Sequence, residues 1–299
     1  YFTDESVAKE QGIIGQEIRM IEDNPDWQIY TQMMKALYQK NTGRISVAGS
    51  IDSIKQITAQ TLYDCHKAFY TPSNMILTVV GNVDPVRVVE LAKEVLPKEA
   101  GPEIARDYGE EPAEVARKRV SQRMEVSMPQ FLLGYKCTPA AEGEDYLRKS
   151  MIGDLACDIL LGESSPLYQR LYESGLINGN FGGSFEMLPG IAYLYAGGDS
   201  KDAETVAGEI QKEADRLARE GIDEAFYQQV RRAAFGGMLR NLNSFENIAV
   251  TLTEGYFHGF DACRFPQVFD QITKADIQAF IRENLTAEHT VLSEILPRA

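Results

Sequence analysis

A repeated stretch is the feature that most constrains the fold of this chain. The 21 residues that begin at Ile57, ITAQTLYDCHKAFYTPSNMIL, align without gaps with those that begin 215 residues later at Ile272, ITKADIQAFIRENLTAEHTVL. Each copy predicts an amphipathic helix, a turn and a strand, and each follows a long predicted helix. Chance similarity is the alternative, but the matching units on both sides favour a duplication. The larger unit around the first copy would end near residue 96, and the one around the second at 299. We therefore expect the first of two homologous domains to lack its opening half.

The composition changes between the two copies. Residues 97–116, PKEAGPEIARDYGEEPAEVA, contain three prolines, two glycines and many acids, which is typical of an extended connection. We therefore predict three segments along the chain. Residues 1–105 would be the C-terminal half of a first domain, 106–116 a linker, and 117–299 a complete second domain.

The predicted elements give an α/β (α+β) fold class. Before the linker we predict helices over 4–23, 25–39 and 50–70, a buried strand over 74–83, and a helix that Asp84 caps. After it we predict strands over 119–127 and 130–137, helices over 144–161 and 165–174, a hairpin over 180–199, helices over 201–219, 223–257 and 274–285, and a strand over 289–296.

Charge and composition exclude several classes of partner. The 44 acidic and 30 basic side chains give a net charge of −14, which argues against nucleic acid and anionic membranes, since both reward clustered Lys and Arg. No apolar run approaches the roughly 20 residues of a membrane span. The four cysteines lie far apart without CxxC spacing, which indicates packed thiols in a reducing compartment. We expect a cytoplasmic location.

Two glutamates fall on an apolar arc of the first predicted helix. Glu10 and Glu17 are seven residues apart, or about 20° around a helix, and Ile13, Ile14 and Ile21 share their arc. A buried carboxylate costs several kcal/mol unless it is paired, hydrogen-bonded, protonated or metal-bound. The arc could face solvent or an interface with arginine partners. Otherwise the two acids would share a proton or flank a cation.

Three segments resemble the pitrilysin/insulinase-type zinc peptidases, the inverzincins, which include mitochondrial processing peptidase. They are VAKEQGIIGQEIRMIEDNPDW, RISVAGSIDSIKQIT and FYTPSNMILTVVGNVD, and the resemblance, closest to bacterial members, covers nearly the whole chain. It implies tandem homologous domains, each a mostly antiparallel sheet packed with helices. The spacing of Glu10 and Glu17 matches the family's E-x6-E pair. The resemblance therefore implies that Glu17 is a zinc ligand. It also implies that Glu10 supports Glu17 without binding the zinc itself.

The other zinc ligands of that family are missing from this sequence. They are the two histidines of an H-x-x-E-H motif, whose glutamate is the general base. The histidines here, His66, His258 and His289, are isolated, and we interpret them as surface or helix-end residues. One carboxylate cannot hold zinc usefully. We expect these residues alone to be inactive, with no catalytic residue in this chain and with zinc only in the intact protein.

A second departure concerns a substrate-binding pair of the family. The stretch LYESGLIN has Tyr172 in place of the arginine and Asn178 in place of the tyrosine, and ordinary helix packing explains Tyr172. This departure implies that a homologous subunit supplies the pair, in a homo- or hetero-dimer. The glycine-rich strand that begins near Gly179 corresponds to one that borders the family's peptide-binding cleft.

The expected function is that of one part of a zinc-dependent peptidase. The intact protein would hydrolyse peptides or unfolded polypeptides through zinc-bound water. One alternative is a non-catalytic family subunit that shapes a peptide-binding chamber for a partner. Another, without the resemblance, is an acidic helical scaffold for protein partners.

Overall fold

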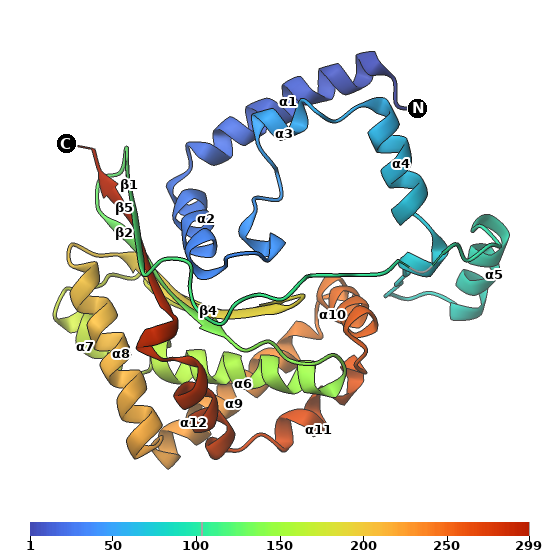
Figure 1. Cartoon of the computed structure of the whole chain (residues 1–299). Helices are drawn as coiled ribbons and strands as arrows, with labels where there is room; N and C mark the ends of the chain where they lie inside the picture. Colours follow the sequence, from blue (N-terminus) through green and yellow to red (C-terminus); the bar gives the residue numbers. More distant parts are fainter. Residues whose placement is uncertain (103, 299) are drawn as a thin grey trace. The chain divides into compact units, whose positions relative to one another are not determined.

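The strands predicted after residue 117 form one sheet in the computed structural model, which describes residues 1–102 and 104–298 (Figure 1). Its five strands have the order β1-β5-β2-β4-β3, and β1 is parallel to β5 while the other pairs are antiparallel. The strands are β1 Arg119–Met124, β2 Gln130–Cys137, β3 Gly182–Leu188, β4 Ile191–Asp199 and β5 Thr290–Pro297. This mostly antiparallel sheet with helices confirms the predicted fold class, and β1 and β3 are its edges.

The chain divides into two compact units that each combine segments from both halves of the sequence. Unit 1 comprises residues 1–20, 47–107 and 238–257, and unit 2 comprises 21–46, 108–237 and 258–299. The domain boundaries predicted from composition stay a prediction. None of the described helices is both long and apolar enough to cross a bilayer.

Helices cover both faces of the sheet in unit 2. On one face lies α2 (Pro25–Leu37), which Asn24 caps by accepting hydrogen bonds from two backbone N–H groups. It approaches closely because β2 carries Gly134 beneath it, where a Cβ would lie only 2.8 Å from Met33 Sδ. The other face packs against α6 (Glu144–Leu161), α8 (Ala203–Glu220) and α12 (Lys274–Asn284). The sheet is therefore the middle layer of unit 2.

The remaining elements correct two predicted helices. The helix expected over 50–70 is broken into α3 (Ile51–Ile54) and α4 (Ala59–Phe69), because Thr58 forms a capping box that starts α4. The helix expected over 223–257 is broken into α9 (Glu224–Asn241) and α10 (Phe245–His258), where Ser244 Oγ accepts the Asn247 N–H. The other helices are α1 Asp4–Glu22, α5 Pro85–Val95, α7 Pro166–Glu173, α11 Phe265–Asp270 and the short η1 Thr42–Arg44, η2 Pro72–Asn74, η3 Ala262–Arg264 and η4 Ala287–His289.

The segment predicted as a strand over 74–83 has no strand partner among the described residues. Its exposure alternates as in a strand, with Met75, Leu77 and Val79 exposed and the residues between them half-buried. A β-strand is completed by hydrogen bonds to a neighbouring strand, and none of the described segments provides one here. The prediction of a buried strand is therefore wrong for the described structure.

The backbone repeats as the sequence does. Thr58 and Thr273 both form capping boxes, and each starts an eleven-residue helix. The residues that follow those helices, Tyr70 (φ −91°, ψ 62°) and Leu285 (φ −96°, ψ 60°), have the same conformation. Each helix is followed by a 3₁₀ helix at the matching position. The same conformations at an offset of 215 residues support a duplication.

Each copy of the repeat also bonds a helix from the other half of the sequence. In unit 2, Ser293 Oγ on β5 donates to the backbone oxygen of Ile29 on α2 at 2.9 Å. In unit 1, the equivalent Thr78 lies 2.8 Å from Thr253 on α10, hydroxyl to hydroxyl. The two halves of the chain therefore exchange helices.

A buried ion pair ties the predicted linker to the sheet of unit 2. Lys136 Nζ on β2 donates to Glu111 Oε1 at 2.9 Å, and both side chains are only 8% exposed. Burial by itself would raise the pKa of Glu111. The backbone N–H groups of Gln39 and Asn41, the Lys136 ammonium and the Lys40 N–H outweigh it and lower that pKa to about 2.

This low pKa predicts a loss of stability in acid. The folded-state pKa of Glu111 lies below the ordinary value of 4.5, so its contribution is complete above about pH 4.5 and is lost as the pH falls towards 2. We expect the free energy of unfolding to drop by about 3 kcal/mol more in wild type than in Glu111→Gln over this window. Urea titrations at several pH values, followed by fluorescence of Trp27 on α2, measure this difference. Parallel pH profiles for the two proteins would contradict it.

Candidate functional site

Glu10 and Glu17 lie on the exposed side of α1. The structure buries Val7, Gly15 and Ile18 instead. Within unit 1, Gln11 faces α3 and donates from Nε2 to the backbone oxygen of Ile54 at 3.0 Å. The prediction that both glutamates point into a buried arc is therefore wrong for the described structure.

The arc that carries the glutamates is an apolar surface. Ile13 and Ile14 between them are 43% and 36% exposed. Glu10 also lines a small cavity of about 160 Å³ in unit 1, whose other lining residues are mostly apolar: Phe2, Ser6, Val7, Gln11, Ile14, Ile54, Ile57 and Leu62. Glu10 thus stands at the rim of an apolar hollow, while Glu17 lies two turns further along the same face.

The side chains present do not complete a metal site. Within residues 1–102 and 104–298, no three His, Cys, Asp or Glu side chains lie close enough together to hold an ion. Catalytic zinc takes three protein ligands and an open position. The described residues could therefore supply only part of the ligand set of a zinc site. The assignment of Glu17 as a zinc ligand that Glu10 supports stays a prediction.

The three histidines make local contacts. His66 stacks on Tyr70 with ring centroids 4.9 Å apart, and His258 stacks on Tyr146 at 3.9 Å. His289 Nδ1 lies 3.2 Å from a threonine hydroxyl three residues earlier. These positions agree with their interpretation as isolated surface or helix-end histidines.

The segment that departs from the family's substrate-binding pair has a structural role. Tyr172 on α7 is exposed and stacks on Tyr168 with centroids 6.0 Å apart. Asn178 Nδ2 donates to Asp199 Oδ2 at 3.1 Å, which joins the approach to β3 to the end of β4. The contact between Tyr168 and Tyr172 lies within α7, and helix packing as the interpretation of Tyr172 stays a prediction.

Sequence reasoning missed an acidic group beside the edge strand β3. Asp154 and Asp158 lie one turn apart on α6, and Glu186 lies on β3. Burial of the carboxyl group, with the charges of Asp158 and Glu186, raises the pKa of Asp154 to about 7. The i, i+4 spacing of the two aspartates was the available signal. This edge of the sheet is therefore acidic.

Comparisons with known proteins place these features in a family. Residues 56–234 match the model described as "Peptidase M16 inactive domain". The chain is 35% identical over its whole length to "Uncharacterized zinc protease YmfH" of Bacillus subtilis, of which it spans 71%, and 22% identical to "Uncharacterized zinc protease YmxG" of the same species, of which it spans 58%.

Solved structures agree with this assignment. An M16-like peptidase from Alicyclobacillus acidocaldarius superposes on the whole chain with a TM-score of 0.94 at 30% identity, and the chain covers 72% of it. A protease from Helicobacter pylori superposes on 99% of the chain with a TM-score of 0.86 at 18% identity, with 73% of that protein covered, which supports the fold alone. The resemblance inferred from the sequence is confirmed. The chain belongs to the M16 family of peptidases.

Proposed function

We propose that this chain is part of a zinc-dependent peptidase in which Glu17 contributes one zinc ligand and Glu10 supports it. The observation that carries the proposal is the exposed apolar face of α1, which presents two carboxylates two turns apart. The relatives named zinc proteases support the metal, and they are longer than this chain. The remaining ligands and the general base would lie in a part of the protein that these 299 residues do not include.

The proposal extends to substrate, partner and compartment. The intact protein would hydrolyse peptide bonds in extended or unfolded polypeptides in the cytoplasm and would pair with a homologous subunit. Tyr172 and Asn178 support such pairing, because the stretch that contains them lacks the family's arginine and tyrosine. By themselves, the 299 residues would be inactive, since a single carboxylate cannot hold catalytic zinc.

Zinc content tests the role of Glu17. In the longer natural protein, Glu17→Gln should reduce bound zinc from about one ion per chain to well below stoichiometry, because an amide is a far weaker zinc ligand than a carboxylate. Glu10→Gln should weaken zinc binding by about 10- to 100-fold, as expected for a residue that orients a ligand. Inductively coupled plasma mass spectrometry and competition with a chromogenic chelator measure both effects.

The matched control is Glu22→Gln, which removes an exposed carboxylate from the same helix. It should leave zinc binding unchanged. Stoichiometric zinc with wild-type affinity after Glu17→Gln would show that the ligand assignment is wrong.

A second candidate function is a non-catalytic subunit that shapes a peptide-binding chamber for a partner. The description of the matching family model as an inactive domain favours it. Under this alternative the longer natural protein binds no zinc and cleaves no peptide, yet raises the activity of a homologous partner. The zinc measurement on the wild-type protein separates the two functions.

A further inference from the structure

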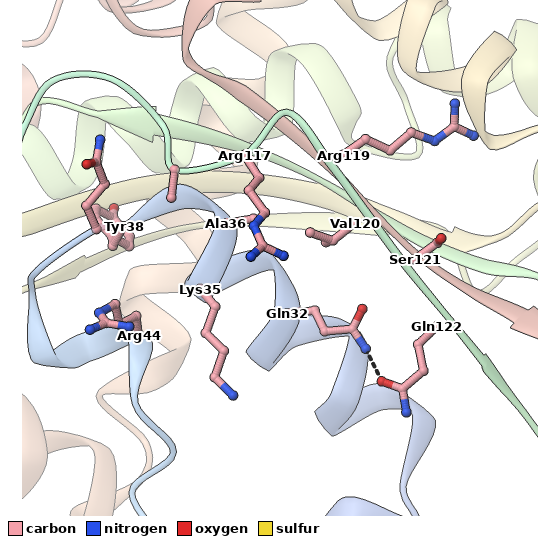
Figure 2. Close-up of a pocket in the computed structure, with 12 residues that line it drawn as sticks. Gln32, Lys35, Ala36, Tyr38, Arg44, Arg117, Arg119, Val120, Ser121 and Gln122 are labelled. Atoms are coloured by element: carbon pink, nitrogen blue, oxygen red, sulfur yellow. Dashed lines mark hydrogen bonds between the residues drawn. The ribbon is translucent and has the colours of Figure 1, made fainter.

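A groove of about 850 Å³ runs along the open edge of β1 in unit 2 (Figure 2). Its floor and walls come from α2 and the two residues after it, from η1, from the chain that leads into β1 and from β1 itself. The lining residues are Gln32, Lys35, Ala36, Tyr38, Gln39, Arg44, Ala116, Arg117, Arg119, Val120, Ser121 and Gln122. A hydrogen bond between the side-chain amides of Gln32 and Gln122 joins α2 to β1 across the groove (Figure 2).

The groove is cationic although the chain is acidic. Its lining includes one lysine and three arginines but no Asp or Glu, whereas the whole chain has 44 acidic and 30 basic residues. Arg119 is already paired with Glu294 at 2.8 Å and Glu204 at 3.2 Å. Lys35, Arg44 and Arg117 form no ion pair with any of the described residues. Charge on this lining would therefore favour an anionic ligand.

One donor in the groove is buried and unsatisfied. Arg44 Nε is inaccessible to water and has no hydrogen-bond partner in the part of the chain that the structure describes. Leaving a buried donor unpaired costs free energy, and the cost is larger when the group is charged. An acceptor supplied by a bound molecule would remove this cost. The orphan donor is a second, independent sign of a ligand.

Beside these cations, the edge of β1 supplies backbone groups that have no hydrogen-bond partner among residues 1–102 and 104–298. In its parallel pairing with β5, the Lys118 oxygen accepts from Leu292 N and the Met124 oxygen accepts from Arg298 N. In a parallel pair, a residue directs both its N–H and its C=O to one side, and the sides alternate along the strand. The N–H and C=O groups of Arg119, Ser121 and Arg123 therefore face the open edge.

We propose that this groove binds an extended acidic peptide from another polypeptide. The peptide adds to β1 as a further strand and directs its carboxylates at Lys35, Arg44 and Arg117. Strand addition provides main-chain hydrogen bonds, and the cations select the side chains of one face of the peptide. The alternating donors and acceptors of the β1 edge match those of a polypeptide backbone. A simple anion has only acceptors and would not match them. This site is separate from the edge strand β3, whose acidic neighbours would repel the same peptide.

Fluorescence anisotropy with a designed probe tests the proposal. The probe is a fluorescein-labelled ten-residue peptide of alternating glutamate and threonine, which presents its acids on one face when extended. Its matched control alternates glutamine and threonine. We expect the acidic peptide to bind the 299-residue chain at least 10-fold more tightly than the amide control, and the difference should shrink as salt rises.

Paired variants locate the binding. The double variant Arg44→Gln/Arg117→Gln should weaken binding at least 10-fold. Lys212→Gln/Arg219→Gln, which removes the same charge from the exposed surface of α8, should leave it unchanged. An equal loss of affinity in both double variants would show that binding depends only on the net charge of the protein. That result would overturn the proposed site.

Strand addition is tested by changing the peptide and not the protein. A change in affinity then cannot come from misfolding of a protein variant. A probe with N-methyl groups on alternate backbone amides keeps its carboxylates but cannot donate hydrogen bonds to the edge. We expect its affinity to fall at least 10-fold, and unchanged affinity would overturn the strand geometry. Binding to the 299-residue chain but not to the longer natural protein would also overturn the proposal, because that protein would then fill its own groove. None of these readouts depends on zinc or on peptide hydrolysis.

Discussion

Lys136→Met is expected to destabilise unit 2 by about 3–5 kcal/mol, because it leaves the buried carboxylate of Glu111 without its counter-charge. Lys136 Nζ donates to Glu111 and to the backbone oxygens of Pro112 at 2.7 Å and Glu114 at 3.1 Å. Its ammonium also lies 4.9 Å from the centre of the Tyr38 ring. Methionine fills a similar volume but satisfies none of these partners.

The paired variant Lys136→Met/Glu111→Gln is the control for this prediction. It removes both charges, so it should recover part of the lost free energy of unfolding. Urea unfolding followed by Trp27 fluorescence reports on α2, which packs against the same sheet. A Lys136→Met variant within about 0.5 kcal/mol of wild type would contradict the buried ion pair.

Gly197→Ala is expected to cost about 4 kcal/mol, whereas the same change at the neighbouring Gly182 should be nearly neutral. The two glycines face each other across β4 and β3. A Cβ at Gly197 would lie 2.0 Å from the Phe131 backbone oxygen, and relief would require the β2–β4 pairing to open. A Cβ at Gly182 meets nothing within 4 Å.

Thermal and urea unfolding of the two alanine variants measure this contrast directly. Both changes remove the same backbone freedom from the unfolded chain, so the comparison isolates the clash. Similar stabilities for Gly197→Ala and Gly182→Ala would show that β2 and β4 are not packed as described.

Local signals made much of the fold predictable. The helix over 144–161 has the predicted bounds because Gly143, at φ 89°, precedes it and Gly162 follows it. The β3–β4 hairpin follows from Pro189 and Gly190, since Gly190 adopts φ 77°, a conformation that favours glycine. The break between α9 and α10 also had a signal, because Asn243 and Ser244 are typical residues before a helix.

Long-range contacts decided what the sequence did not reveal. Apolar residues on α1 occupy two neighbouring arcs, and packing against α3 selects the one with Val7 and Ile18 over the one with Ile13 and Ile14. The predicted linker gave no sign that Glu111 would be buried beside β2, since acidic, proline-containing segments are usually solvated. The groove along β1 was hidden because Lys35, Arg44 and Arg117 are scattered in the sequence and converge only when α2 packs on the sheet.

The exchange of α2 and α10 has a consequence for how this protein can be dissected. The backbone passes between the two units five times, after residues 20, 46, 107, 237 and 257. Cleavage near residue 107 would remove one of these five passages and leave the other four within the two fragments. Neither fragment would then contain a whole unit. Proteolytic nicking there should give two chains that elute together, and separately expressed halves would each need the other as a template for folding.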